Sequence, residues 1–206
     1  MTGKNFNRIL TIFALLVGAA FFNQTQAQTT DAQVAKIRQL YSDTNRRIEQ
    51  GAEDKTSGFH YAAWTIGGER DGQQWRAVGS MKATDEFWFD GEPGFDEGQK
   101  ADARKTIRRI VSTYAGADGE LRERSEYLFN PAGELVFAYR IEHTGGEDGS
   151  QIERRFYFAK GKLIRVASEN GKTKDGKFTA EETGAATGEQ QAAKRLQNIF
   201  ALHFSE

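Results

Sequence analysis

One stretch of this sequence occurs twice, and it constrains the fold more than any other feature. Tyr127 to Phe137 reads YLFNPAGELVF, and Phe156 to Val166 reads FYFAKGKLIRV. Each copy has two aromatic residues separated by one residue, then a short break, Gly, a charged residue and Leu. Aromatic residues that alternate on both sides of a tight turn are typical of antiparallel hairpins. The repeat therefore indicates either a duplicated binding site or a duplicated hairpin.

The turn residues favour the hairpin. In NPAG, the residues Asn130, Pro131 and Gly133 occupy the positions preferred by a type I turn that ends in a left-handed residue. Such a turn places Phe129 opposite Leu135 on the two strands. The first copy is thus predicted to be a structural corner of a sheet.

The second copy predicts a shorter hairpin. Its loop consists of Lys160 and Gly161, which places Phe158 opposite Leu163. Continued without interruption, and with HTGGEDGS as the link between the copies, these registers predict further pairs: Tyr127 with Phe137, Ser125 with Tyr139, Arg124 with Arg140, Tyr157 with Ile164, Ile141 with Ile152, and Phe137 with Phe156. Apolar cross-strand pairs stabilise a sheet, so we expect one face to carry the aromatic rows.

The remainder of the chain predicts more strands, framed by two helices. Apolar residues recur at helical spacing over about residues 31–50 and 188–204, with Thr30 and Thr187 as predicted caps. Over about residues 59–168, aromatic-rich segments such as FHYAAWTI, QQWRAVGSM and DEFWF alternate with turn sequences. We therefore expect an α+β fold: an antiparallel β-meander of about eight strands, curved or partly closed, with the terminal helices packed on it.

The N-terminus, residues 1–27, is typical of a secretory signal peptide. Two basic residues precede an apolar run from Ile9 to Phe22, and small residues follow up to Ala27. The run is shorter than the roughly 20 apolar residues that span a bilayer, so we expect cleavage after Ala27 and no membrane span afterwards. The exported chain is then one domain over residues 28–206, in the periplasm or secreted.

Composition excludes several classes of protein. Lys and Arg number 28 and Asp and Glu number 29, and this near-neutral balance argues against a nucleic-acid binder. The chain has no Cys, so it has neither disulfides nor thiol catalysis and must be stabilised by burial alone. We expect most of the aromatic residues of the first strand group to be core rather than pocket: Trp64, Trp75, Phe87, Trp88 and Phe89.

Arginines on the predicted sheet are the candidate binding residues. The predicted registers place Arg124 opposite Arg140, and guanidinium groups side by side repel one another unless an anion lies between them. The anion is either a ligand or the Glu side chains of the same strands, which would form a solvated charge lattice. The candidate anion-binding face consists of Arg122, Arg124, Arg140 and Arg155.

No metal or cofactor site is predicted. DGKFTAEE has the spacing of the second half of a calcium loop up to Glu182, but Gly171 and Thr173 occupy the earlier ligand positions. The acidic stretch DGEPGFDE has no fixed ligand spacing, and the three His are isolated from one another. Carboxylate pairs for hydrolysis stay open, because residues distant in sequence can meet in space.

The segments FNPAGELV and FAKGKLI locally resemble the hairpins of membrane-occupation repeat proteins and of many exported bacterial proteins. The resemblance covers about a quarter of the chain, and the copies are unevenly spaced, unlike a repeat array. No functional residue is carried over from it.

The sequence favours an exported, noncatalytic binding or envelope-interaction protein, whose partner is a small anionic ligand or another protein. One alternative is a carboxylate-based hydrolase that uses the aromatic strand group. The other is a structural accessory protein that docks an acidic partner through the arginines.

Overall fold

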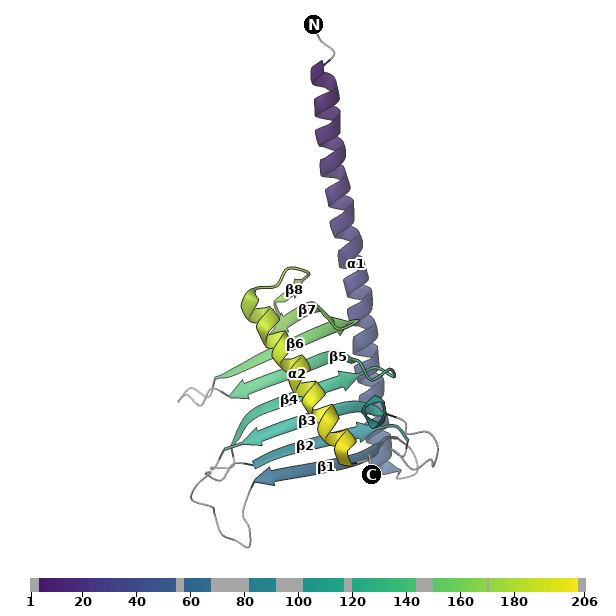
Figure 1. The fold of residues 1–206 in the computed structure, drawn as a ribbon, viewed down its shortest axis with the longest axis vertical. Helices are drawn as coiled ribbons and strands as arrows, with labels where there is room; N and C mark the ends of the chain where they lie inside the picture. The colour runs from purple at the N-terminus through teal and green to yellow at the C-terminus, as the bar shows by residue number, and fades with distance from the viewer. Residues whose placement is uncertain are drawn as a thin grey trace.

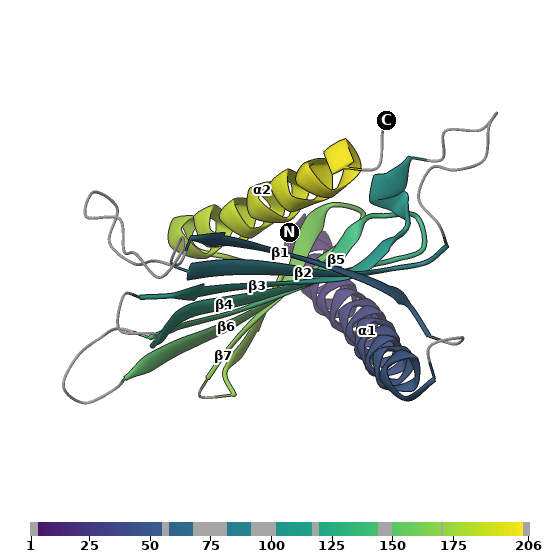
Figure 2. The same ribbon diagram turned by 90° about the horizontal axis from the view of Figure 1, so that it is seen from below.

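A computed structural model shows one open antiparallel sheet with a helix on each face (Figures 1 and 2). It describes residues 4–54, 58–67, 82–91, 102–116, 120–143, 150–169 and 171–203, with side chains from residue 29 onward. The strand order is β1 to β8, and each strand pairs with the next in sequence. The predicted α+β meander of eight strands is therefore confirmed, and the sheet does not close into a barrel.

The elements have the following bounds. They are α1 Lys4–Glu53, β1 His60–Gly67, β2 Lys82–Phe89, a 3-10 turn at Ala103–Lys105, β3 Ile107–Ala115, β4 Leu121–Phe129, β5 Leu135–His143, β6 Gln151–Ala159, β7 Lys162–Ser168, β8 Thr173–Asp175 and α2 Ala180–His203. The helix predicted at residues 31–50 lies within α1, and Thr30 lies inside that helix rather than at its start.

The C-terminal helix begins earlier than the predicted residue 188. Thr179 caps it: the Thr179 hydroxyl accepts from the backbone N–H of Glu182, and the Glu182 carboxylate accepts from the N–H of Thr179 at 2.6 Å. This reciprocal capping box starts the helix at Ala180. Glu182, whose spacing matched a calcium ligand, therefore caps a helix, and the predicted cap Thr187 lies within it.

Both repeated hairpins have the predicted turns. Gly133 has the left-handed φ of 80° that its bulged turn requires, and Lys160 and Gly161 have φ values of 50° and 71° in a two-residue loop. The pairs next to the turns, Phe129 with Leu135 and Phe158 with Leu163, form as predicted. The aromatic–Gly–Leu repeat is thus a structural hairpin device.

Beyond these first pairs, the predicted registers are wrong by one residue. A β-bulge follows each turn, between Leu128 and Phe129 and between Tyr157 and Phe158. The observed pairs are Tyr127 with Ala138, Ser125 with Arg140, Arg124 with Ile141, Tyr157 with Arg165, Glu142 with Ile152, and Ala138 with Phe156. Because side chains alternate between faces, a one-residue shift moves Phe137 to the face opposite Tyr127 and Phe156.

Helix α2 covers the more apolar face of the sheet (Figure 2). The core there is built from Phe87, Ile107, Tyr127, Phe129, Phe156, Phe158, Leu196 and Phe200, with further buried residues around them. Glutamines of α2 bond the repeated hairpin turns: Gln190 donates to the Gly161 carbonyl at 2.9 Å, and Gln197 donates to the Gly133 carbonyl at 3.1 Å. The predicted packing of the C-terminal helix on the aromatic rows is confirmed.

Helix α1 covers part of the other face with a smaller apolar cluster. Val34 and Ile37 of α1 pack against a sheet surface that consists of Leu128, Phe137, Tyr157 and Ala167. The sheet is therefore apolar on both faces near the Gly turns. Further along the strands the α1 face is charged.

The aromatic residues of β1 and β2 lie on both faces of the sheet, because successive side chains of a strand point to opposite faces. Phe87 and Phe89 are buried core residues, as predicted. Trp64 packs against the same core, 4.4 Å from Phe87 between ring centres. Trp88 is half-buried on the α1 face, 5.4 Å from the guanidinium carbon of Arg109.

Some predicted features lie outside the described residues. They are Trp75, the segment QQWRAVGSM, and most of DGEPGFDEGQKAD and of HTGGEDGS. The side chains of the predicted signal peptide are likewise not described. In the described part of the chain, no helix is long and apolar enough to cross a membrane.

Candidate functional site

The candidate arginines do not form one cluster. Arg140 lies on the α2 face, where it donates to Glu189 of α2 at 3.1 Å and also pairs with Glu123 and Glu142. Arg124 lies on the α1 face beside Glu126, at 2.8 Å. The predicted opposition of Arg124 and Arg140 is wrong, because the bulge next to Phe129 moves their side chains to different faces.

Each of the candidate arginines has a carboxylate of its own chain within ion-pair distance. Arg122 pairs with Glu120 at 3.3 Å, and Arg155 pairs with Glu153. Arg122 and Arg155 are therefore in ion pairs with Glu side chains, as Arg124 and Arg140 are. An external anion would have to compete with these pairs, so a surface of arginines alone does not make a strong site.

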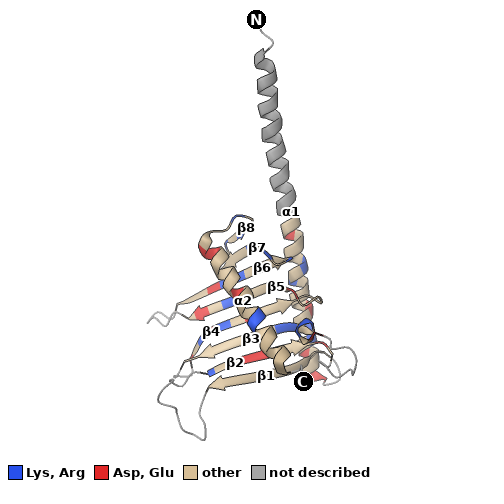
Figure 3. Cartoon of the chain, viewed as in Figure 1, with Lys and Arg blue, Asp and Glu red and all other residues tan. Residues whose placement is uncertain are grey.

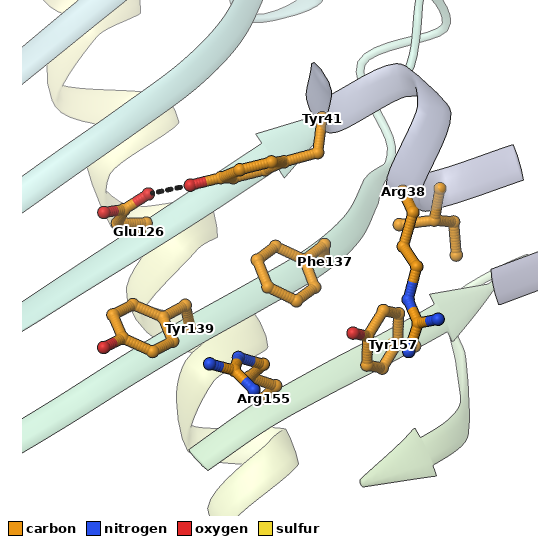
Figure 4. Close-up of a pocket in the computed structure, with 8 residues that line it drawn as sticks. Arg38, Tyr41, Glu126, Phe137, Tyr139, Arg155 and Tyr157 are labelled. Atoms are coloured by element: carbon orange, nitrogen blue, oxygen red, sulfur yellow. Dashed lines mark hydrogen bonds between the residues drawn. The ribbon is translucent and has the colours of Figure 1, made fainter. Parts of the chain in front are cut away.

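A pocket of about 490 Å³ lies on the α1 face, between α1 and strands β4 to β6 (Figure 4). Its lining residues are Ile37, Arg38, Tyr41, Glu126, Phe137, Tyr139, Arg155 and Tyr157. This volume is within the range of small-molecule sites, roughly 300–1,000 Å³. The pocket contains one candidate residue, Arg155, and borders a second, Arg124, through Glu126.

Aromatic rings form the walls of this pocket. Phe137 lies 5.6 Å from Tyr41 and 5.1 Å from Tyr157 between ring centres. Tyr139 stands further along β5, beside the guanidinium of Arg155 at 5.8 Å (Figure 4). The wall rings therefore come from one helix and two neighbouring strands, and they enclose an apolar space with polar groups at its edge.

Glu126 lies at one end of the pocket, and its hydrogen bonds are satisfied. It accepts from Tyr41 at 3.0 Å, from Arg109 at 2.6 Å and from Arg124 at 2.8 Å. Burial on its own would raise the pKa of Glu126, but the charge of Arg109 and the hydrogen bonds from Arg124 and Arg109 outweigh it and lower the pKa. Glu126 is therefore ionised at neutral pH, and its carboxylate is held by three hydrogen-bond donors of the fold.

Tyr41 supports this assignment. Burial, followed by the negative charge of Glu126, raises the pKa of the Tyr41 hydroxyl. The hydroxyl therefore keeps its proton and donates a hydrogen bond to Glu126. Their hydrogen bond joins α1 to β4 at the end of the pocket (Figure 4).

The balance of charge around the pocket is positive. Arg109 and Arg124, which do not line the pocket, share the carboxylate of the lining residue Glu126. Arg155 has Glu153, while Arg38 has no ion pair among the described residues and lies 6.0 Å from the Tyr157 ring centre. Cationic groups at the edge of an aromatic pocket suit an anionic ligand with an apolar body.

Sequence reasoning missed the contribution of α1. Both residues belong to the helix predicted at residues 31–50, with Tyr41 at the apolar spacing and Arg38 off it; Arg38 is exposed, as that spacing predicts, and still lines the pocket. Arg38 is one residue after Ile37 and so lies at the margin of the stripe, which is the only signal that could have marked it. Which strand residues it would meet depended on where the helix crosses the sheet.

The other large groove described, of about 470 Å³, lies between α2 and the hairpin turns. Its glutamine amides already bond the turn carbonyls. Its carboxylates are occupied too, since Asp102 accepts from Arg104 and Glu134 accepts from Asn130. This groove is part of the docking of α2.

Two acidic residues of the aromatic strand group, Asp85 and Glu86, bear on the hydrolase alternative. Asp85 accepts a hydrogen bond from Ser112 at 2.6 Å, and Glu86 accepts one from Tyr61 at 2.9 Å. Neither carboxylate lines the pocket. In the same described ranges, no three His, Asp or Glu side chains gather in a way that could hold a metal ion.

Comparison with known proteins found no match to a family model, to a curated protein or to a solved structure. The site has to be interpreted from the residues of this chain.

Proposed function

We propose that this chain is an exported, noncatalytic binding protein, and that the pocket between α1 and strands β4 to β6 is its ligand site. The observation that carries this proposal is the pairing of aromatic walls with Arg38 and Arg155 at the edge of one pocket. The signal-like N-terminus supports export to the periplasm or beyond. The ligand is a small anion, a carboxylate or a phosphate ester, with a flat or aliphatic apolar body.

The two arginines have different parts in this proposal. Arg38 has no ion pair among the described residues, so it meets the anion without losing a partner. The guanidinium of Arg155 must either leave its ion pair with Glu153 to bind the ligand or pair with both at once. The exchange weakens binding but adds selectivity, because a neutral ligand cannot replace the carboxylate.

The test is an isothermal calorimetric titration of the purified protein with 2-naphthoate and, separately, with dodecanoate. The neutral probe 2-naphthamide matches the first compound in shape and lacks its charge. We expect the carboxylates to bind and the amide to bind about tenfold more weakly, which is about 1.4 kcal/mol. Replacing either pocket arginine, as Arg38→Ala or Arg155→Ala, should remove this preference.

Lys36→Ala is the matched control, because Lys36 is an exposed cation of the same helix and does not line the pocket. It should leave the affinity for 2-naphthoate unchanged. Equal binding of the acid and the amide, or equal losses for Lys36→Ala and Arg38→Ala, would contradict the proposal. Loss of binding in Arg38→Ala with an unchanged melting temperature would separate a ligand contact from damage to the fold.

A further inference from the structure

The sheet has two edges, and they differ in length and charge. At one edge, β8 has three residues, Thr173–Asp175, and two of them are charged. Lys174 pairs with Glu182 at 2.7 Å, and Asp175 pairs with Arg165. Short, charged edge strands are the usual protection against pairing with another chain. The β8 edge is therefore closed to further strands.

The other edge lacks this protection. Strand β1 has eight residues, HYAAWTIG, with no Lys, Arg, Asp, Glu or Pro (Figure 3), and its pairing with β2 has no bulge. Tyr61 and Ile66 are 55% and 67% exposed there, although both side chains are large and apolar. In the described part of the chain, no strand lies beyond β1. A long, uncharged, regular edge is a template for strand addition.

Helix α2 extends the same surface above the sheet. His203 in its last turn stacks on Trp64 of β1, with 4.6 Å between ring centres. The neighbouring Leu202 is 71% exposed. The last turn of α2 therefore lies over the open edge, as Figure 1 shows, and adds an exposed apolar side chain to it.

We propose that a second copy of this chain pairs with β1, so that the two sheets continue across a two-fold axis. Self-pairing suits this strand because antiparallel addition is symmetric: if residue i of one copy meets residue j of the other, then residue j of the first copy meets residue i of the second. Since β1 has no charged side chain, no register brings like charges together. A strand from an acidic or a basic partner would find no complementary charge on β1.

Side-chain alternation restricts the register of this pairing. Residues directly opposite in an antiparallel pair point to the same face, so an odd residue meets an odd one and an even residue meets an even one. The two strands overlap over most of their length only if the two-fold axis passes near the middle of β1, at Ala63 or at Trp64. The second register sets Ala62 against Ile66 and Trp64 against Trp64, which continues the apolar row under α2 across the interface.

The experiment is sedimentation velocity of the full protein from low to high micromolar concentration, with the variant Ile66→Lys. We expect the parent protein to form a dimer and the variant to weaken it at least tenfold, because an edge lysine blocks strand addition. Ile152→Lys is the matched control: Ile152 is also an exposed strand residue, 40% exposed, but belongs to the interior strand β6. It should dimerise as the parent does.

Amide hydrogen exchange gives a second measurement. In the parent protein and in Ile152→Lys, exchange across β1 should slow as concentration rises, and in Ile66→Lys it should not. A parent protein that stays monomeric throughout the range overturns the proposal. So does a dimer that Ile66→Lys leaves intact, or one that both lysine variants weaken equally. Equal melting temperatures of the two variants at low concentration exclude misfolding as the cause.

Discussion

The two faces of this sheet are built for different purposes. The α2 face carries the large buried rings and, among the residues that the structure describes, one buried carboxylate, Glu189, which accepts from Tyr127 at 2.9 Å and from Arg140 at 3.1 Å. The α1 face carries fewer apolar residues, a buried cluster of charges around Glu126, and the pocket. The first face is filled with large side chains, and the second leaves a cavity of about 490 Å³.

This difference follows from what each helix contributes. Helix α2 presents small and apolar residues to the sheet, so Ala186 and Ala193 allow it to approach closely while Leu196 and Phe200 fill the core. Helix α1 presents Val34 and Ile37 to the sheet, and the next turn places Tyr41 in the wall of the pocket. The α2 layer is closely packed, whereas the α1 layer leaves a cavity beside its smaller apolar cluster.

The largest expected effect tests the faces with adjacent residues. Phe129 and Leu128 are 0% and 1% exposed, but they belong to the α2 core and the α1 cluster respectively. Phe129→Ala should lower the free energy of unfolding by about 3–5 kcal/mol, and Leu128→Ala by about 2–3 kcal/mol, since the α1 layer can adjust to a lost side chain. Urea denaturation measures both. Equal losses would show that the faces are equally well packed.

The second test concerns the buried carboxylate of α2. Glu189→Ala leaves the Tyr127 hydroxyl and one side of Arg140 without their partner, while Glu123 and Glu142 still pair with Arg140. We expect a loss of about 2–3 kcal/mol in the same denaturation measurement. Arg46→Ala, which breaks an exposed ion pair with Asp43, is the reference. If Glu189→Ala costs no more than Arg46→Ala, the buried bonds of Glu189 do not stabilise the fold.

The third test compares the two repeated turns. A Cβ added at Gly133 would lie 3.0 Å from the Cα of Lys105, whereas one at Gly161 would meet nothing within 4 Å. Both glycines have positive φ. Gly161→Ala should therefore cost about 1 kcal/mol from backbone strain, and Gly133→Val about 2 kcal/mol or more from strain and contact together. Thermal unfolding of the two variants checks the order, and a Gly133→Val protein as stable as the parent would overturn the turn assignment.

The fourth test uses pH to separate the faces, with a smaller expected effect. The folded-state pKa of Glu126 is below its ordinary value of 4.5, so its ion pairs stabilise the fold above that pH. This contribution is lost as pH falls through the folded pKa. The stability difference between the parent and Glu126→Gln should be largest near pH 7 and should shrink towards pH 3. A constant difference would mean that Glu126 contributes through packing alone.

The smallest expected effect sharpens the role of the pocket. Glu153→Gln removes the charge that competes for Arg155 and leaves a side chain of the same size. Binding of 2-naphthoate should become about threefold tighter, equal to about 0.6 kcal/mol. Calorimetry measures it, and Glu120→Gln, which releases Arg122 outside the pocket, is the control. Weaker binding in Glu153→Gln would show that Glu153 positions Arg155 rather than competing for it.

The candidate site could be predicted only in part. The sequence identified Arg124 and Arg155, and the structure brings both near one pocket, Arg155 as a lining residue and Arg124 through Glu126. The sequence could not separate Arg140 from them, because the bulge that moves Arg140 to the other face adds one residue, Val136, to β5, and no Gly or Pro marks it. Arg38 was out of reach for another reason: its neighbours on the sheet are roughly 90 to 120 residues away in sequence, from Glu126 to Tyr157.

Local sequence by itself determined the hairpin turns, the α+β meander and the start of α2. The capping residues Thr179 and Glu182 of α2 lie in DGKFTAEE, the segment compared above with a calcium loop. Turn glycines and capping residues act through backbone angles over a few residues, so their effect can be deduced from adjacent letters. The tertiary structure alone decided the registers beyond the bulges, the face of each arginine and the pocket under α1. These depend on how two helices pack on opposite faces of one sheet, where the sum of many contacts outweighs any local preference.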